Sequence, residues 1–400
     1  MGSNGKRDPV VDAAQYLIES PDLWISGVPS KLADAAPRVV SLPDGGEAWS
    51  FESGAWLRPL GLEVEAGRGP IDVRGSGHSY SDIREGMYQP VARLADMAID
   101  EVDAACVFPT YGQDLRYLRD RALQVACVRA YNDAAWAWAR AAGGDRLIPQ
   151  ALVPAVGLDE AVTELERVAA MGYRGIVFCG FPAMGDKPQP EEDRFWAVCN
   201  EAGLVVNLVA GGPLAGDLVP AAPARYVGPN GRARAVDIPI EVAWTQQATS
   251  KNVNLSWLVL TGVLERFPSL QLVMVDTAAG WLPTCGELLD WNYRYAQFIA
   301  FAKLRYRPSD YIKRQVKATI RSERRAVEAR RDVGTSAMMW SSGYPQSSST
   351  WPSSPHALDS LFSGVPAADR AAMQGGNCAA LYRIATAEKA TTGPAASRRN

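Results

Sequence analysis

Histidine is nearly absent from this sequence of 400 residues, which contains only His78 and His356. Catalysis by a Ser–His–Asp triad would need one of them beside an exposed serine, and neither lies near a Gly-x-Ser-x-Gly turn. His78 stands in a loop without an obvious partner. His356 stands near the start of a helical stretch, where we expect it to be exposed. We therefore expect neither histidine to be catalytic or to bind a metal.

Strong charge and long apolar runs are also missing. The net charge is −3 and the calculated isoelectric point is about 5.7, which gives no basic surface for nucleic acid. No apolar run reaches the roughly 18 residues that span a bilayer, and the first residues lack the apolar segment of a secretion signal. We therefore predict a cytoplasmic protein with no nucleic-acid or membrane partner.

The six cysteines are scattered and form no Cys-x-x-Cys pair. Most of them are therefore expected to be small, buried apolar side chains. Cys179, near the end of a predicted strand, is the one that could contact a substrate.

Short apolar strands alternate with helical stretches along the chain. The predicted strands cover residues 10–14, 102–109, 146–154, 174–181, 204–212, 270–276, 316–320 and 336–343. Gly203 is expected to end the helix that precedes the fifth strand. Eight strand–helix units in about 330 residues predict an α/β fold of the (β/α)8 TIM-barrel type. A doubly wound sheet is the alternative, but no Gly-x-Gly-x-x-Gly opens a helix after the first strand.

Residues 1–385 are predicted to form this single barrel, and the polar residues 386–400 a disordered tail. The largest insertion, residues 25–100 after the first strand, is rich in Gly, Pro and Trp, and we expect a lid or an interface arm. Four tryptophans in or near loops could line an interface: Trp24, Trp49, Trp56 and Trp281.

Several strings resemble the amidohydrolase-2 family, which includes aminocarboxymuconate-semialdehyde decarboxylase. They are VVDAAQYLIESPDLW (10–24), SDIREGMYQPVARLADM (81–97), VRAYND (128–133), RGIVF (174–178), TGVLERFPSLQLVMVDTAAGWLP (261–283) and MWSSGYPQSSSTWP (339–352). The resemblance covers most of residues 10–385. It implies a barrel that holds one or two divalent metals at the carboxyl ends of its strands, with hydrolase or decarboxylase activity.

The chain departs from this family pattern at the implied metal ligands. Alternate residues of a strand point to the same face, so a His-x-His pair aims both rings inward. The positions that match ligands are Ala14 and Tyr16 on the first strand, Asn207 and Val209 on the fifth, and Gly343 and Gln346 after the eighth. Three of these side chains offer no donor atom, so we predict no metal and no other cofactor.

Asp276, after the sixth strand, is the only acidic group retained at these positions. It could be the acid or base of a metal-free site, or it could simply hydrogen-bond the backbone or Asn207. Tyr16 could fill the space left by a metal, and Asn207 and Gln346 could bond to each other, to Asp276 or to water. A site for Mg²⁺ or Ca²⁺ built from Asp12, Glu19 and Asp276 is a further alternative.

Arg84 and Tyr88 match family positions near the barrel mouth, where Arg84 could bind a substrate carboxylate or instead pin the insertion by a salt bridge. Four functions remain open. If the matched positions are not the ligand positions, the chain could be a metal-dependent hydrolase or decarboxylase, as the resemblance implies. The chain could be a degenerate subunit, in a homodimer or in a hetero-oligomer with a metal-bearing paralogue. It could be a metal-independent lyase, cyclase or proton-transfer enzyme that uses Asp276. It could also bind a small molecule at the barrel mouth without turnover.

Overall fold

The computed structural model describes residues 7–43, 45–69, 71–143, 145–185, 187–210 and 240–385. The tail predicted to be disordered, residues 386–400, lies outside this part. None of the helices in the described part is both long and apolar enough to cross a membrane.

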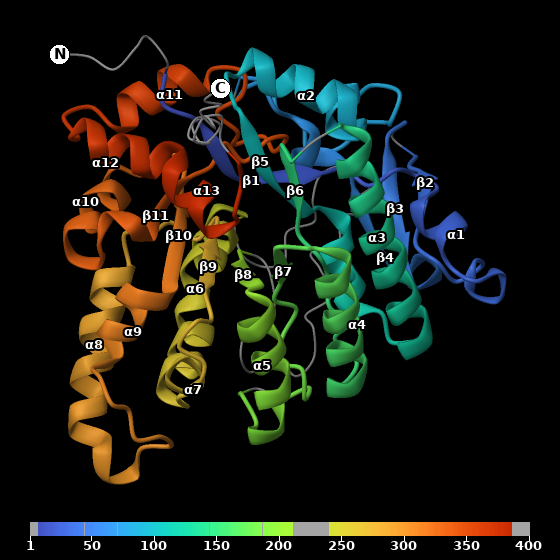
Figure 1. The fold of residues 1–400 in the computed structure, drawn as a ribbon. Helices are drawn as coiled ribbons and strands as arrows, with labels where there is room; N and C mark the ends of the chain where they lie inside the picture. The colour runs from blue at the N-terminus through green and yellow to red at the C-terminus, as the bar shows by residue number, and fades with distance from the viewer. Residues whose placement is uncertain are drawn as a thin grey trace, which may run out of the picture.

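Eight parallel strands of the described part form the barrel (Figure 1). They are β1 (Val11–Leu17), β5 (Ala104–Pro109), β6 (Leu147–Pro149), β7 (Gly175–Val177), β8 (Val205–Val209), β9 (Leu272–Val275), β10 (Val316–Ile320) and β11 (Met338–Trp340). All eight predicted strands are confirmed. They are almost wholly buried, because helices cover the outer face and packed side chains fill the inside.

Hydrogen bonds close the strands into a ring. Pairing follows the order β1-β5-β6 and β7-β8-β9-β10-β11. Ala151, just after β6, joins the two sheets: its N–H donates to the carbonyl of Gly175 (3.1 Å), and its carbonyl accepts from Val177 (2.8 Å). On the other side, Gly343 donates to the carbonyl of Ala14 (3.1 Å). The fold is therefore a (β/α)8 barrel.

A helix follows each barrel strand. These helices are α2 (Pro90–Ile99), α3 (Arg121–Ala141), α4 (Leu158–Met171), α5 (Asp193–Ala202), α6 (Ile240–Leu260) with α7 (Val263–Arg266), α8 (Leu282–Ala296) with α9 (Pro308–Gln315), α10 (Arg324–Val333), and finally α11 (Ser354–Leu361), α12 (Ala367–Ala371) and α13 (Asn377–Leu381). Gly203 ends α5 with φ +62°, as predicted, since glycine adopts this left-handed conformation without a steric penalty.

The segment after β1 forms a separate three-stranded antiparallel sheet. Its strands are β2 (Arg38–Ser41), β3 (Glu47–Phe51) and β4 (Trp56–Pro59), and short α1 (Leu23–Gly27) precedes them. The insertion is shorter than predicted, because α2 lies within residues 25–100 and is the helix of the first barrel unit.

Aromatic packing stabilises the insertion. Trp24 and Trp49 are fully buried with ring centroids 4.5 Å apart, and Trp56 stacks on Phe51 at 5.3 Å. The expectation that these three tryptophans line an interface is therefore wrong. Trp281 is partly buried.

The insertion sits on the loop after β11. The N–H of Ala66 donates to the carbonyl of Pro345 (3.0 Å), and the N–H of Ser347 donates to the carbonyl of Leu62 (2.8 Å). At the opposite end of the barrel, a Cβ at Gly375 in the last helical segment would lie 2.2 Å from the carbonyl of Pro9, just before β1. The insertion therefore covers one end of the barrel and the C-terminal helices cover the other.

Candidate functional site

Three side chains from different strands meet at the carboxyl end of the barrel. Tyr16 lies near the end of β1, Asp276 directly follows β9, and Arg321 directly follows β10. The hydroxyl of Tyr16 donates to one oxygen of Asp276 (2.5 Å), and a terminal nitrogen of Arg321 donates to the other (2.9 Å). Both carboxylate oxygens are thus bonded, and the Asp276 and Arg321 side chains are only 16% and 15% exposed.

Arg321 fills the space that a side chain at position 343 would need. Gly343 has φ +72°, and a Cβ built there would lie 2.1–2.7 Å from three atoms of the guanidinium. The second terminal nitrogen donates to the hydroxyl of Ser348 (2.5 Å), while the buried Nε has no partner among the described residues. Any side chain at position 343 would therefore displace Arg321.

The insertion adds a second charged group to this end of the barrel. Arg58, which belongs to β4, lies 3.6 Å from a carboxylate oxygen of Glu63 and 3.5 Å from one of Asp114. The amide of Gln346 donates to the other oxygen of Glu63 (3.4 Å). Burial raises the pKa of Glu63, and the negative charges of Asp114 and Asp276 add to that effect.

The surroundings of Tyr16 and Arg321 determine whether each side chain is protonated. Burial, with Asp276 adding to it, raises the pKa of Tyr16 well above its usual range, so Tyr16 stays protonated and acts as a hydrogen-bond donor. Burial opposes the positive charge of Arg321, but the surrounding acidic groups, with Asp276 the strongest, together outweigh burial and raise the pKa of Arg321. Asp276 has φ +54°, and its N–H donates to the hydroxyl of Thr319 (2.9 Å). We call Tyr16, Glu63, Asp276 and Arg321 the mouth cluster.

Sequence reasoning identified only half of the mouth cluster. Tyr16 and Asp276 were predicted, but Arg321 and Glu63 were missed. Arg321 had a signal, because it is a charged residue directly after a predicted barrel strand, where such folds place their chemistry. Glu63 had none, because only the docking of the insertion brings it to the barrel.

Asn207 does not belong to the mouth cluster. Its amide donates to the side chain of Gln150 and to the carbonyl of Ile176 (2.9 Å each), and its oxygen accepts from the hydroxyl of Tyr382 (2.6 Å). Tyr382 comes from the C-terminal helical region that covers the amino end of the barrel. The expectation that Asn207 bonds to Gln346 or Asp276 is therefore wrong.

Two of the remaining positions that the resemblance matches to ligands hold buried apolar residues, and the third holds Gln346. Ala14 is fully buried and contributes backbone hydrogen bonds, and Val209 is buried in the barrel interior. Gln346 lies at the carboxyl end, as predicted, but its partner is Glu63.

Arg84, Tyr88 and Cys179 lie outside the mouth cluster. Arg84 pairs with Asp96 (2.5 Å), which is the salt-bridge alternative rather than substrate binding. The half-buried Tyr88 packs edge-on against Tyr80. Burial raises the pKa of the Cys179 thiol, which lines a small hollow between the β6–α4 and β7–α5 connections.

The two histidines differ in their surroundings. His356 is exposed on α11, as predicted. His78 is buried in the insertion and pairs with Glu65, and its Nδ1 lies 3.3 Å from the guanidinium of Arg74. The expectation that His78 lacks a partner is therefore wrong, and its role is to hold the insertion together.

The residues that the structure describes do not fit the metal that the family pattern implies. Within the described ranges, no three His, Cys, Asp or Glu side chains converge closely enough to hold a metal ion. The alternative set is dispersed. Asp12 accepts from Ser342 and Gln15, and Glu19 accepts the N–H groups of residues 110–112. The carboxylates of Asp12, Glu19 and Asp276 are therefore each bonded to a separate part of the fold.

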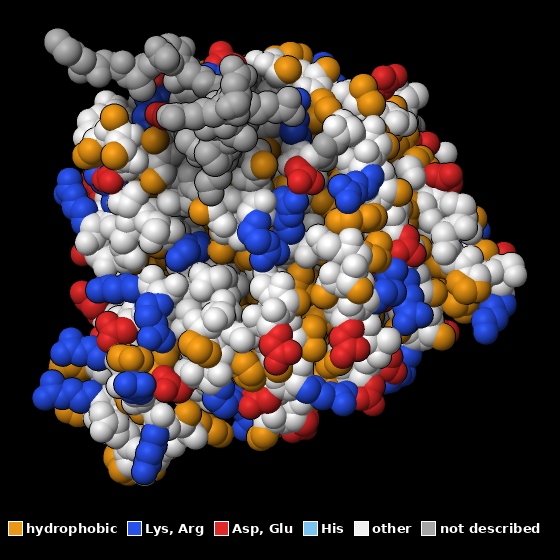
Figure 2. All heavy atoms as spheres, viewed as in Figure 1, with side chains coloured by type: hydrophobic (Ala, Val, Ile, Leu, Met, Phe, Trp, Pro, Cys, Tyr) orange, Lys and Arg blue, Asp and Glu red, His pale blue; other side chains and the backbone are white. Residues whose placement is uncertain are grey.

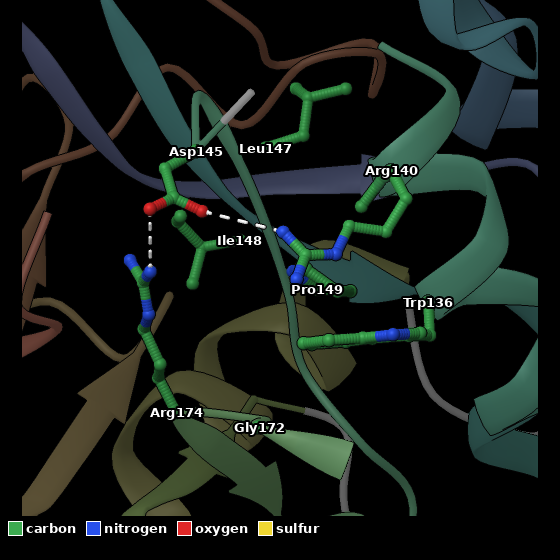
Figure 3. Close-up of a pocket in the computed structure, with 9 residues that line it drawn as sticks. Trp136, Arg140, Asp145, Leu147, Ile148, Pro149, Gly172 and Arg174 are labelled. Atoms are coloured by element: carbon green, nitrogen blue, oxygen red, sulfur yellow. Dashed lines mark ion pairs between the residues drawn. The ribbon is translucent and has the colours of Figure 1, made fainter. Parts of the chain in front are cut away.

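A second hollow lies at the opposite end of β6. Figure 3 shows Asp145 between Arg140 (3.8 Å) and Arg174 (3.0 Å), with Trp136 beside Arg140. Its two guanidinium groups and one carboxylate leave a net charge of +1, and it shares no residue with the mouth cluster.

Comparison with known proteins agrees with this barrel fold. The model of the amidohydrolase family matches residues 84–384. The chain belongs to this amidohydrolase family. No curated protein matches the chain in sequence.

Three solved amidohydrolase-family relatives illustrate the likeness. An amidohydrolase from Mycobacterium avium subsp. paratuberculosis K-10 has a TM-score of 0.73 at 18% identity, over 94% of this chain and 98% of that one. The 5-carboxyvanillate decarboxylase of Sphingomonas paucimobilis has a TM-score of 0.63 at 19% identity, over 95% of this chain and 100% of that one. A dihydroxybenzoic acid decarboxylase from Polaromonas sp. JS666 was solved with bound manganese. It has a TM-score of 0.60 at 16% identity, over 96% of this chain and 99% of that one. At these identities the likeness establishes the fold alone.

Proposed function

We propose that this chain is a metal-independent lyase of the amidohydrolase fold that acts on a small carboxylic acid. The observation that carries the proposal is the fit between Arg321 and Gly343. The guanidinium supplies a fixed positive charge at the end of the barrel where metal-dependent members hold a cation, and the missing side chain at position 343 makes room for it. The substrate class is suggested by the decarboxylases of the same fold, which act on aromatic acids by their names.

The mouth cluster provides the groups that such a reaction requires. In a phenolic acid, the ring carbon that bears the carboxyl group first takes up a proton, which turns the phenolate into a conjugated ketone. The bond to the carboxyl group then breaks, its electron pair passes through the ring onto the ketone oxygen, and carbon dioxide leaves. Arg321, whose Nε has no hydrogen-bond partner among the described residues, can stabilise the negative oxygen. Glu63, whose pKa is raised, donates its proton to the carbon and regains one from water.

The test is carbon dioxide release from 5-carboxyvanillate and 2,6-dihydroxybenzoate by protein treated with a chelator. Glu63→Gln is expected to slow release by about 100-fold or more, the usual contribution of a proton donor. Glu328→Gln, which removes a carboxylate paired with Arg325 on α10, is the matched control and should leave the rate unchanged. Activity that appears only after one equivalent of metal is added would refute metal independence.

Assembly as a degenerate subunit is the second candidate. It is favoured by the two bonds to Asp276, which leave neither oxygen free to accept a substrate proton. In that case the folded, metal-free protein would turn over nothing alone. It would also raise the activity or stability of a purified, histidine-rich paralogue when the two are mixed.

A further inference from the structure

Six large apolar side chains on α8 and in the residues that follow it are exposed to solvent. They are Leu288, Trp291, Tyr295, Phe298, Ile299 and Phe301, with exposures from 57% to 85%. We call them the aromatic surface. Monomeric proteins seldom expose so many large apolar groups within one short segment, so this surface calls for a partner.

Local structure places three of these side chains on one side of α8 and the other three in the turn and loop that directly follow it. Leu288, Trp291 and Tyr295 are spaced by three and four residues and therefore project from the same side of α8. The rings of Trp291 and Tyr295 lie 4.7 Å apart. A single 3-10 turn, Gln297–Ile299, then carries the chain away from the helix and leaves Phe298 85% exposed. α8 and this turn project beyond the neighbouring helices in Figure 1.

Positive charge surrounds the aromatic surface. The exposed basic residues between positions 287 and 314 are Arg294, Lys303, Arg305, Arg307, Lys313 and Arg314. The acidic residues in the same stretch are Glu287, Asp290 and Asp310, so the stretch carries +6 − 3 = +3, in a chain whose net charge is −3. Figure 2 shows blue and orange side chains intermixed where α8 projects.

Two of those three carboxylates are already engaged. Asp290 accepts from the N–H and the hydroxyl of Ser309 (2.8 and 2.7 Å). Asp310 accepts from the N–H of Arg307 at the start of α9. These donors are neutral, so both carboxylates keep their charge and the stretch keeps its net charge of +3.

We infer that the aromatic surface docks on an anionic lipid surface. Tryptophan, tyrosine and phenylalanine beside lysine and arginine are typical of segments that enter the lipid–water interface without crossing the bilayer. The side chains project from a convex end rather than lining a groove, and a lipid interface accepts such side chains without a shaped pocket. A second copy of the chain fits less well, because two-fold pairing through this end would bring the same positive charges together. The expectation of no membrane partner rested on the lack of long apolar runs, and an interfacial surface of this kind needs no such run.

Sedimentation with lipid vesicles tests this inference. The full chain is expected to sediment with vesicles of phosphatidylcholine containing about one third phosphatidylglycerol, and roughly tenfold less with phosphatidylcholine alone. Binding to the anionic vesicles should fall as salt is raised, since exposed charges are screened.

Two pairs of variants separate the apolar from the charged contribution. Phe298→Ser with Phe301→Ser should abolish sedimentation, whereas Ile71→Ser with Val91→Ser, which removes exposed apolar groups elsewhere, should leave it unchanged. Lys303→Glu with Arg305→Glu should weaken it, and Arg325→Glu on α10 should not. Thermal unfolding of each variant confirms that it is folded.

Two results would overturn the inference. One is equal sedimentation of the wild type and the phenylalanine variant. The other is a lipid-free wild type that is a dimer by light scattering while the phenylalanine variant is a monomer, which would make the surface a subunit interface. Both readouts are independent of turnover at the mouth cluster.

Discussion

Replacing Gly343 by alanine tests whether the guanidinium of Arg321 really occupies the space above that residue. The new Cβ would lie 2.1 Å from one guanidinium nitrogen, so Arg321 would have to leave Asp276. The φ of +72° adds backbone strain of about 1–2 kcal/mol for a residue with a side chain. Disrupting an ion pair that is mostly buried adds about 2–3 kcal/mol, below the cost for a fully buried pair.

The expected shift in melting temperature follows from chain length. At about 2.1 cal/mol/K per residue, 400 residues give an unfolding entropy near 0.8 kcal/mol/K, so each kcal/mol lowers Tm by about 1.2 °C. A total of about 3–5 kcal/mol therefore predicts a loss of about 4–6 °C by differential scanning calorimetry.

Gly364→Ala is the matched control. Gly364 has φ +73°, and a Cβ there meets nothing within 4 Å, so it reports backbone strain alone, about 1–2 °C. In an Arg321→Met background, Gly343→Ala should also cost only the strain, because the clashing group is gone. Equal losses for Gly343→Ala and Gly364→Ala would refute the placement of Arg321.

Three further outcomes follow from buried polar groups. Burial raises the pKa of Asp12 to about 6, so the native state holds its proton between about pH 4 and 6 while the unfolded chain releases it. Unfolding free energy should therefore fall by about 3 kcal/mol as pH rises through that window, and Asp12→Asn should remove that part of the slope in urea titrations. Arg93→Met should cost about 3 kcal/mol in the same assay, because fully buried Arg93 donates to the carbonyls of Tyr16, Gly86 and Met87; a loss below 1 kcal/mol would contradict this. Tyr382→Phe should cost about 1–2 kcal/mol by leaving the oxygen of Asn207 unbonded, and an unchanged midpoint would count against that bond.

The sequence predicted the barrel well because barrel strands carry a strong local signal. Each strand is a short apolar run buried on both faces, and a helical stretch separates it from the next. The sequence of a strand gives no such signal for how far along the barrel axis each side chain lies. Asn207 was assigned to the mouth because strand alternation gives the face a side chain points to, and it says nothing of which layer that side chain occupies. The bonds to Gln150 and Tyr382 place it in the interior instead.

The candidate site was less predictable because it depends on contacts between distant segments. Glu63 reaches the barrel only through the docking of the insertion on the loop after β11, and no local pattern encodes that contact. Tyr16 and Asp276 were found because a comparison of strand ends finds residues on the barrel itself. Their partner Arg321 was not predicted, because the family pattern points to metal ligands and a guanidinium is not one.

Gly343 and Arg321 together argue for a rebuilt site rather than a decayed one. If a ligand at position 343 had simply been lost, position 321 would not need to be an arginine. Here the glycine leaves the space that the guanidinium fills, and the guanidinium pairs with Asp276, the one acidic group at the positions that the family resemblance assigns to metal ligands. Gly343→Asp, which restores the residue implied by the family pattern, should therefore bind no metal, because positions 14 and 209 still lack donors and the new carboxylate would compete with Asp276 for Arg321. About one equivalent of zinc or manganese retained by that variant on elemental analysis, with the wild type metal-free, would show that the metal site had needed only one residue to recover.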